Sequence, residues 1–220
     1  GAHSWHAMSF SPRTGLAYIP VHQLPAIFSD KGITQANWKF PANMALDGAV
    51  HTTVDDALRN DPAFGKGYLV AWNPVTQTAA WRIDMPKLWN GGTMATAGNL
   101  VFHAETVGTF NAYAADTGKK LWSFNAGGPI NGSPITYTVG GKQYVTIVTG
   151  VGGSASTMGW IPGSETHAVY GQSPREVLTF VLGGKAALPK REPAKLEPLP
   201  DPEFKPDPAR AARGAALYAN

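Results

Sequence analysis

At 220 residues the chain is long enough for one ordinary domain with a substantial core. Charged residues make up 15%, the net charge is +3, and no basic block or aromatic-and-arginine cluster occurs, which leaves no electrostatic case for nucleic-acid binding. The absence of cysteine excludes disulfides, thiolate catalysis and cysteine-based metal sites within these residues. No run of about 18 apolar residues predicts a membrane span.

The first 20 residues predict two strands around a turn. The composition supports strands, because 25 Gly, 18 Pro and 7 Trp are typical of an all-β chain with many tight turns. Alternation along the first strand predicts two faces, one with His3, Trp5 and Ala7 and the other with Ser4, His6 and Met8. The spacing of His3 and His6 suits a metal pair, but no other ligands lie nearby, so we favour hydrogen-bonded strand histidines.

A long excursion follows at residues 21–66. A stretch of this length with weak periodicity indicates a functional loop or cap, and the alternative is a solvated connector. Residues 53–59 are compatible with one or two helical turns before Pro62. The adjacent carboxylates of Asp55 and Asp56 do not predict a catalytic pair, because neighbouring side chains on a helix or strand do not face each other.

Residues 67–122 contain one pattern twice. Four residues recur at the same offsets, first as Ala71, Asn73, Thr76 and Trp81 and then as Ala112, Ala114, Thr117 and Trp122, so the copies lie 41 residues apart (112 minus 71). A period in the low forties, built from short strands and turns, predicts four-stranded propeller blades. Each copy is read as a strand, a tight turn and a second strand. We expect the two Trp side chains to be plates between neighbouring blades, not ligand contacts.

The turn of the second copy has a clear physical basis. Asp116 and Thr117 can bond nearby backbone amides and Gly118 can take a positive φ, so two strands can reverse there. In the first copy Gln77 stands where Gly118 does. A left-handed Gln would cost roughly 1 kcal/mol, so a different conformation is an alternative for the first turn.

Residues 89–93 read Trp-Asn-Gly-Gly-Thr. Two adjacent glycines can leave backbone amides uncovered, so a planar carboxylated cofactor could approach there, with Trp89 as an apolar plate and Asn90 as an amide. On the residues alone, a tight bend that enters a strand is an equal alternative.

The last third of the chain changes character. Residues 99–103 and 143–148 predict strands covered on both faces, and residues 175–184 predict a last strand followed by a stop. Residues 187–208 then carry seven Pro among alternating charges, which predicts a stiff extended tether. Residues 208–218 look helical.

The repeated pattern A-x-[DN]-x-x-T-G-x-x-x-W resembles the tryptophan docking motif of the quinoprotein dehydrogenases. The segments after Trp81 and Trp122 strengthen the resemblance, because both contain Gly-[Ser/Thr]-x-x-Thr, at residues 92–96 and 132–136. The resemblance implies an eight-bladed β-propeller that carries pyrroloquinoline quinone (PQQ) and a calcium ion. The end of the chain resembles the opening helix, G-x-x-L-Y, of a c-type cytochrome domain.

The resemblance implies an all-β fold, a partial β-propeller of four-stranded antiparallel blades followed by an extended Pro-rich tail. It assigns residues 1–184 to C-terminal blades with a loop insertion at 21–66, residues 185–208 to a linker, and residues 209–220 to the start of a truncated cytochrome helix. Eight blades of about 41 residues need well over 300 residues. N-terminal blades are therefore expected to be missing, and the family implies a periplasmic location.

The resemblance also implies the site residues. The first eight residues are similar to the family stretch G-x-H-N-W-x-P-M, which brings an Asn and a Trp to the rim of the quinone. Trp5 matches that Trp, whereas Ser4 stands where Asn is usual and Ala7 where Pro is usual. The remaining candidates come from W-N-G-G-T and from a G-x-G-G return, so the cofactor-binding set is Ser4, Trp5, Trp89, Asn90, Val151 and Gly152. The catalytic Asp and calcium ligands of the family belong upstream, so no catalytic or metal-binding residue is assigned.

The implied function is that of the C-terminal portion of a PQQ- and calcium-dependent alcohol dehydrogenase that passes electrons to a haem c in a missing C-terminal domain. Its expected partners are a small alcohol substrate, a cytochrome c domain or other acceptor, and the missing N-terminal blades. The fragment alone is expected to be inactive. The alternative is a quinone-free propeller scaffold for protein–protein interaction, because the docking repeat only holds blades together.

Overall fold

The computed structural model describes residues 3–24, 27–29, 34, 51–53, 60–62, 64–150, 175–189 and 207–218. Contacts divide the chain into two compact units, residues 1–190 and residues 191–220. The second unit holds helix α2 (Pro208–Tyr218), whose first turn is capped by Asp207: its Oδ1 accepts hydrogen bonds from the backbone amides of Ala209 and Arg210. No helix in the described part of the chain is long and apolar enough to cross a membrane.

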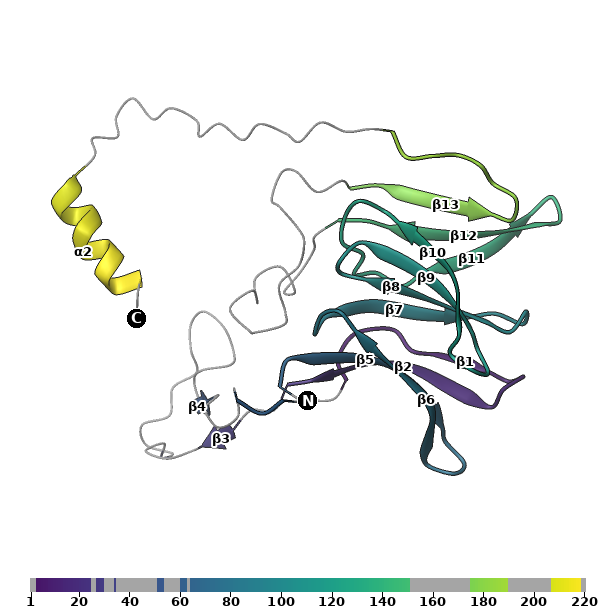
Figure 1. The fold of residues 1–220 in the computed structure, drawn as a ribbon, viewed down its shortest axis with the longest axis horizontal. Coiled ribbons are helices and arrows are strands. Elements are labelled where there is room, and N and C mark those ends of the chain that lie inside the picture. The colour runs from purple at the N-terminus through teal and green to yellow at the C-terminus, as the bar shows by residue number, and fades with distance from the viewer. Residues whose placement is uncertain are drawn as a thin grey trace. The chain divides into compact units, whose positions relative to one another are not determined.

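The described strands of the first unit form three larger sheets and a small hairpin, all antiparallel (Figure 1). The sheet that we call blade A has the order β1 (Ser9–Ser11), β2 (Leu16–Gln23), β5 (Lys66–Asn73) and β6 (Thr78–Met85). Blade B consists of β7 (Asn90–Ala95), β8 (Leu100–Glu105), β9 (Thr109–Ala114) and β10 (Lys120–Asn125). Blade C has three described strands, β11 (Ile135–Val139), β12 (Lys142–Val148) and β13 (Val177–Val181). The hairpin pairs β3 (Ile27–Ser29) with β4 (His51–Thr53).

The two copies of the repeat occupy equivalent positions in blades A and B, as predicted. Both turns close with the same backbone hydrogen bond, from Gln77 N to Asn73 O at 2.9 Å and from Gly118 N to Ala114 O at 2.8 Å. Gln77 is left-handed, with φ of 56°, like Gly118 with φ of 72°. The alternative of a different first turn is therefore wrong. Asn73 stabilises the strained turn, because its Oδ1 accepts hydrogen bonds from two backbone amides within it.

Trp81 joins blade A to blade B. Its Nε1 donates a hydrogen bond to the Ala115 carbonyl at 3.1 Å, and its ring lies against the Cα of Gly118. Tyr18, from β2, donates to the same carbonyl at 3.0 Å and is fully buried. The predicted role of Trp81 as a plate between blades is confirmed.

Apolar side chains fill both seams. The seam between blades A and B holds Leu16, Tyr18, Ala71, Val101 and Ala115. The seam between blades B and C holds Met94, Ala104, Phe110, Ala126, Ile130, Val145 and Ile147. Trp122 borders this second seam, where its ring meets Phe180 of β13 edge-on at 5.4 Å. Three blades thus pack face to face, and the predicted partial propeller is confirmed.

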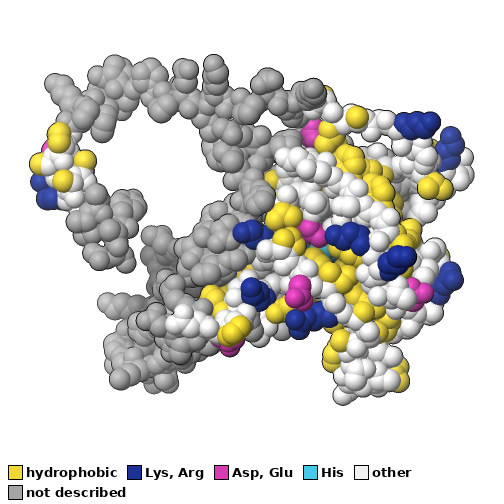
Figure 2. Space-filling model, in the orientation of Figure 1, with side chains coloured by type: hydrophobic (Ala, Val, Ile, Leu, Met, Phe, Trp, Pro, Cys, Tyr) yellow, Lys and Arg dark blue, Asp and Glu magenta, His cyan; other side chains and the backbone are white. Residues whose placement is uncertain are grey.

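Other apolar side chains remain exposed along the strands of the first unit (Figure 2). The same view shows Lys and Arg side chains interleaved with apolar and neutral surface, with no continuous basic patch on this face. This distribution agrees with the lack of a basic block in the sequence.

The N-terminal segment differs from its prediction. Residues 3–8 bend instead of forming a strand, and β1 begins only at Ser9. The expected two faces are therefore wrong: His6 is buried, while the neighbouring Trp5 is exposed and its ring stacks on that of His6 at 4.8 Å. Hydrogen bonds to distant residues explain the bend, because His3 Nδ1 bonds the Pro20 carbonyl and the Ala7 carbonyl accepts from Thr93 N.

The excursion is shorter at both ends than predicted, since β2 continues to Gln23 and β5 begins at Lys66. Residues 54–59, with Asp55, Asp56 and the proposed helical turns, lie outside the described residues. The strands predicted at residues 99–103, 143–148 and 175–184 are present as β8, β12 and β13.

Candidate functional site

Two segments that are far apart in the sequence bring an aromatic pair together at one end of the seam between blades A and B. The rings of Trp5 and Trp89 stack with centroids 4.9 Å apart and an angle of 22°. Trp89 precedes β7 and is 4% exposed, whereas Trp5 precedes β1 and is 52% exposed. The pair therefore has a buried plate and an outer plate, the outer one accessible to a ligand or a further part of the protein.

Two histidines complete what we call the rim aromatic cluster, which consists of Trp5, His6, His22 and Trp89. The ring of His22 lies 4.9 Å from that of Trp89, and the ring of His6 lies 5.7 Å from it. Burial and the neighbouring histidines lower the pKa of His6 to about 4, and burial is also the main cause that lowers the pKa of His22 to about 4. Both imidazoles are uncharged at neutral pH.

Several buried polar atoms of this region lack a protein partner. Asn90 begins β7, and its Nδ2 donates to the Lys87 carbonyl at 3.2 Å, but no described residue bonds its Oδ1. The same holds for Trp89 Nε1 and for the Nδ1 atoms of His6 and His22. Buried polar groups normally have partners, so these atoms mark a place where a polar ligand or water can bind.

The two glycines after Asn90 serve close packing. A β-carbon on Gly92 would lie 2.0 Å from Ser133 Oγ, and one on Gly91 would lie 2.8 Å from the Ala104 β-carbon. The pairing of β7 with β8 shifts register between Asn90 and Thr93, which is the geometry of a bulge. This arrangement favours the tight-bend alternative for the glycines, and a cofactor approach to their amides stays a prediction.

Thr93 ties the N-terminal segment to blade B. Its hydroxyl contacts Ser9 Oγ at 2.9 Å and the Tyr18 carbonyl at 3.2 Å, and its backbone amide donates to the Ala7 carbonyl at 2.9 Å. Sequence reasoning missed this role. The only available signal was a polar residue placed directly after the glycines of a buried strand.

Comparison with known proteins identifies the architecture. Residues 1–145 match the PQQ family described as the β-propeller domain of glucose, ethanol and alcohol dehydrogenases. The chain belongs to this quinoprotein dehydrogenase family. The resemblance carried by the docking motif is thereby confirmed.

Several relatives match nearly the whole chain. It is 40% identical to quinohemoprotein alcohol dehydrogenase ADH IIB of Pseudomonas putida, covering 99% of this chain and 30% of that protein. It is 37% identical to 1-butanol dehydrogenase (cytochrome c) of Thauera butanivorans, covering 98% of this chain and 30% of the relative. The crystal structure of quinohemoprotein alcohol dehydrogenase from Comamonas testosteroni superposes with a TM-score of 0.69 at 36% identity, covering 99% of this chain and 31% of that one. The chain thus spans about 30% of the length of these relatives.

Against this quinoprotein fold, the structure brings together three of the six candidate residues, Trp5, Trp89 and Asn90. Ser4 precedes Trp5 and is exposed, and no polar contact supports a role for it. Val151 and Gly152 lie outside the described residues. Among the residues that the structure describes, no three His, Asp or Glu side chains are grouped as metal ligands, so His3 and His6 gain no third partner.

Two further titratable groups of this quinoprotein chain are buried in the seam behind the cluster, and neither was a candidate. Glu105 pairs with Asn90 across β7 and β8, and its carboxylate accepts hydrogen bonds from Asn111 Nδ2 at 2.6 Å and from Thr109 Oγ1. Burial raises the pKa of Glu105. His103, two residues earlier, is fully buried, and burial lowers its pKa to about 3.

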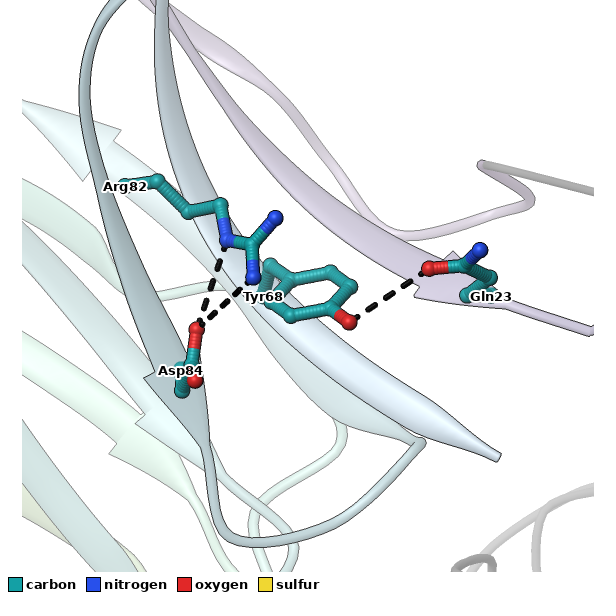
Figure 3. A network of polar contacts seen from close by, with 4 residues as sticks. All are labelled: Gln23, Tyr68, Arg82 and Asp84. Carbon is teal, nitrogen blue, oxygen red and sulfur yellow. Dashed lines mark hydrogen bonds and ion pairs between the residues drawn. The ribbon is translucent and has the colours of Figure 1, made fainter. Parts of the chain in front are cut away.

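A separate polar network lies on blade A (Figure 3). Arg82 lies over the ring of Tyr68 at 3.9 Å and bonds Asp84 at 3.3 Å, while Tyr68 donates to Gln23 Oε1 at 3.4 Å. The Arg82 and Asp84 side chains are 54% and 77% exposed, so the ion pair contributes at most about 1 kcal/mol. It has no contact with the rim aromatic cluster in the described part of the chain.

Proposed function

We propose that this chain is the C-terminal part of the propeller of a PQQ- and calcium-dependent alcohol dehydrogenase that passes electrons to a c-type haem. Relatives that match 98–99% of the chain are named quinohemoprotein alcohol dehydrogenase and 1-butanol dehydrogenase (cytochrome c). The single observation that carries the proposal is the rim aromatic cluster beside Asn90, at the start of strand β7.

The residues present fit a planar, carboxylated quinone. Trp5 offers an exposed ring face, and the unpartnered Nε1 of Trp89 and Oδ1 of Asn90 offer one donor and one acceptor. When bound, PQQ supplies the two-electron oxidant for the alcohol. In this proposal Trp5, Trp89 and Asn90 bind and orient the cofactor, and the buried rings of His6 and His22 exclude water behind Trp89.

The rest of the machinery lies outside this chain in our proposal. The catalytic Asp and the calcium ligands belong to the upstream blades, and the haem c belongs to a domain that follows the start of helix α2. Residues 1–184 are then blades, residues 185–208 are a linker, and the enzyme works in the periplasm on a small alcohol. The 220-residue fragment is inactive because it supplies only one arc of the pocket.

The experiment uses the full-length protein with PQQ and Ca²⁺, and it measures visible absorption and alcohol-dependent dye reduction. We expect Trp5→Ala to weaken PQQ binding about tenfold, a loss of about 1.4 kcal/mol. Phe10→Ala is the matched control, because Phe10 is an aromatic residue of similar exposure, 54% against 52% for Trp5. A wild-type protein that shows neither an absorption change nor dye reduction would favour the quinone-free scaffold instead.

A further inference from the structure

Blade A holds the segment that carries Trp89 and Asn90 through a contact that only glycine permits. Gly67 of β5 is buried, and a β-carbon there would lie 2.1 Å from the Lys87 carbonyl oxygen and 2.8 Å from that of Leu88. The same β-carbon would lie 2.8 Å from Asn90 Nδ2. Since two of these atoms belong to the backbone, any side chain at position 67 must push residues 87–90 away from blade A.

Blade B holds the same segment through one hydroxyl group. Thr106 is 1% exposed, and its Oγ1 donates a hydrogen bond of 2.6 Å to the carbonyl of Trp89. Thr106 is itself fixed, because the carbonyl of the preceding residue, Glu105, accepts hydrogen bonds from the amides of Gly108 and Ile130. The Trp89 backbone is therefore tied to the loop that connects β8 and β9.

We infer that Gly67 and Thr106 are positioning residues, which together set the place of Trp89 and Asn90 at the proposed cofactor face. The inference rests on the proposed function, since it assigns these residues to the same site. Neither residue contacts the exposed face of Trp5, so each acts through the 87–90 segment. Gly67 sets how closely this segment approaches blade A, and Thr106 anchors it to blade B.

The size of the effect follows from how strictly a reacting group must be placed. A misplacement of about 1 Å can cost on the order of 100-fold in rate. Gly67→Ala requires a shift of that order, because the Lys87 carbonyl must retreat from 2.1 Å to an ordinary contact distance. Thr106→Val keeps the side-chain volume and removes only the hydrogen bond, so its effect is expected to be smaller.

The test compares Thr106→Val, Thr106→Ser and Gly67→Ala in the full-length protein. Thr146→Val is the matched control, because Thr146 of blade C is also buried and its hydroxyl bonds Thr179 Oγ1 at 2.8 Å. We expect Thr106→Val to raise the Kd for PQQ about tenfold, Gly67→Ala to raise it further, and Thr106→Ser to restore it to within about twofold. Thr146→Val should lower Tm without changing the Kd.

A second readout needs no quinone. The stacked indoles of Trp5 and Trp89 should give a near-ultraviolet circular dichroism signal, identified by its loss in Trp5→Phe. We expect this signal to decrease in Thr106→Val and Gly67→Ala and to persist in Thr106→Ser and Thr146→Val. If the wild-type protein binds no PQQ, the proposed function fails, and the dichroism alone decides the positioning. Unchanged dichroism and an unchanged Kd in both Thr106→Val and Gly67→Ala would overturn the inference.

Discussion

Trp81 of blade A lies so close to Gly118 of blade B that no β-carbon fits between them. A β-carbon on Gly118 would lie 2.8 Å from Trp81 Cδ2, and Gly118 also has a positive φ of 72°. The hydrogen bond from Trp81 Nε1 to the Ala115 carbonyl fixes the ring in this place. The repeat thus joins neighbouring blades through two features at once, a left-handed turn in one blade and a Trp in the other.

Gly118→Ala should destabilise the propeller by about 2 kcal/mol or more, because left-handed strain costs roughly 1–2 kcal/mol and the clash with Trp81 adds to it. Thermal unfolding of the full-length protein measures the loss as a lower Tm. Gly98→Ala is the control, because a β-carbon there has its nearest neighbour at 3.7 Å. Equal Tm values for the two variants would show that the contact does not stabilise the seam.

Gln77→Gly should have the opposite sign. Gln77 is left-handed and exposed, so glycine removes the strain of roughly 1–2 kcal/mol and adds a chain-entropy cost of roughly 0.5–1 kcal/mol. We expect a net gain of about 0.5 kcal/mol from these two effects. A small rise in Tm would be the result, and a fall would mean that the Gln77 side chain has a contact in the full-length protein.

The sequence allowed the blades to be predicted because their signals are local. The 41-residue repeat and the turn residues mark strands and reversals within a few positions of one another. The bend at residues 3–8 could not be predicted in this way, because the hydrogen bonds of Ala7 and Thr93 join positions 86 residues apart (93 minus 7). Trp5, Trp89 and Asn90 came from family resemblance. Glu105 and His103 were missed because only the stacking of blades buries them.

Acid should weaken the seam between blades A and B. The pKa values of His6, His22 and His103 are lowered to about 4, 4 and 3, so between about pH 6.5 and these values the unfolded chain binds more protons than the folded one. Stability therefore falls as the pH drops through this window. Glu105 acts in the opposite sense, since its raised pKa makes the folded state bind more protons, and it cannot cancel three histidines.

Tm measured from pH 7 to pH 4 tests this dependence. His103→Leu should flatten the curve, and it removes no described hydrogen bond because both ring nitrogens lack a partner. His3→Leu is the comparison, because His3 is only partly buried and bonds the Pro20 carbonyl. A His103→Leu curve as steep as that of the wild type would contradict the assignment.

The isolated 220-residue chain should self-associate. In the described part of the chain blade C has three strands where blades A and B have four, and β13 pairs only with β12. Its surface is apolar, with Ile135, Val139, Val148 and Val177 each at least 58% exposed. An unpaired strand edge beside an apolar face favours pairing with another chain. Sedimentation should detect oligomers, and Thr179→Lys on β13 should reduce them, because a charge on an edge strand opposes pairing. A monodisperse wild-type monomer would show that the edge is covered within the chain itself.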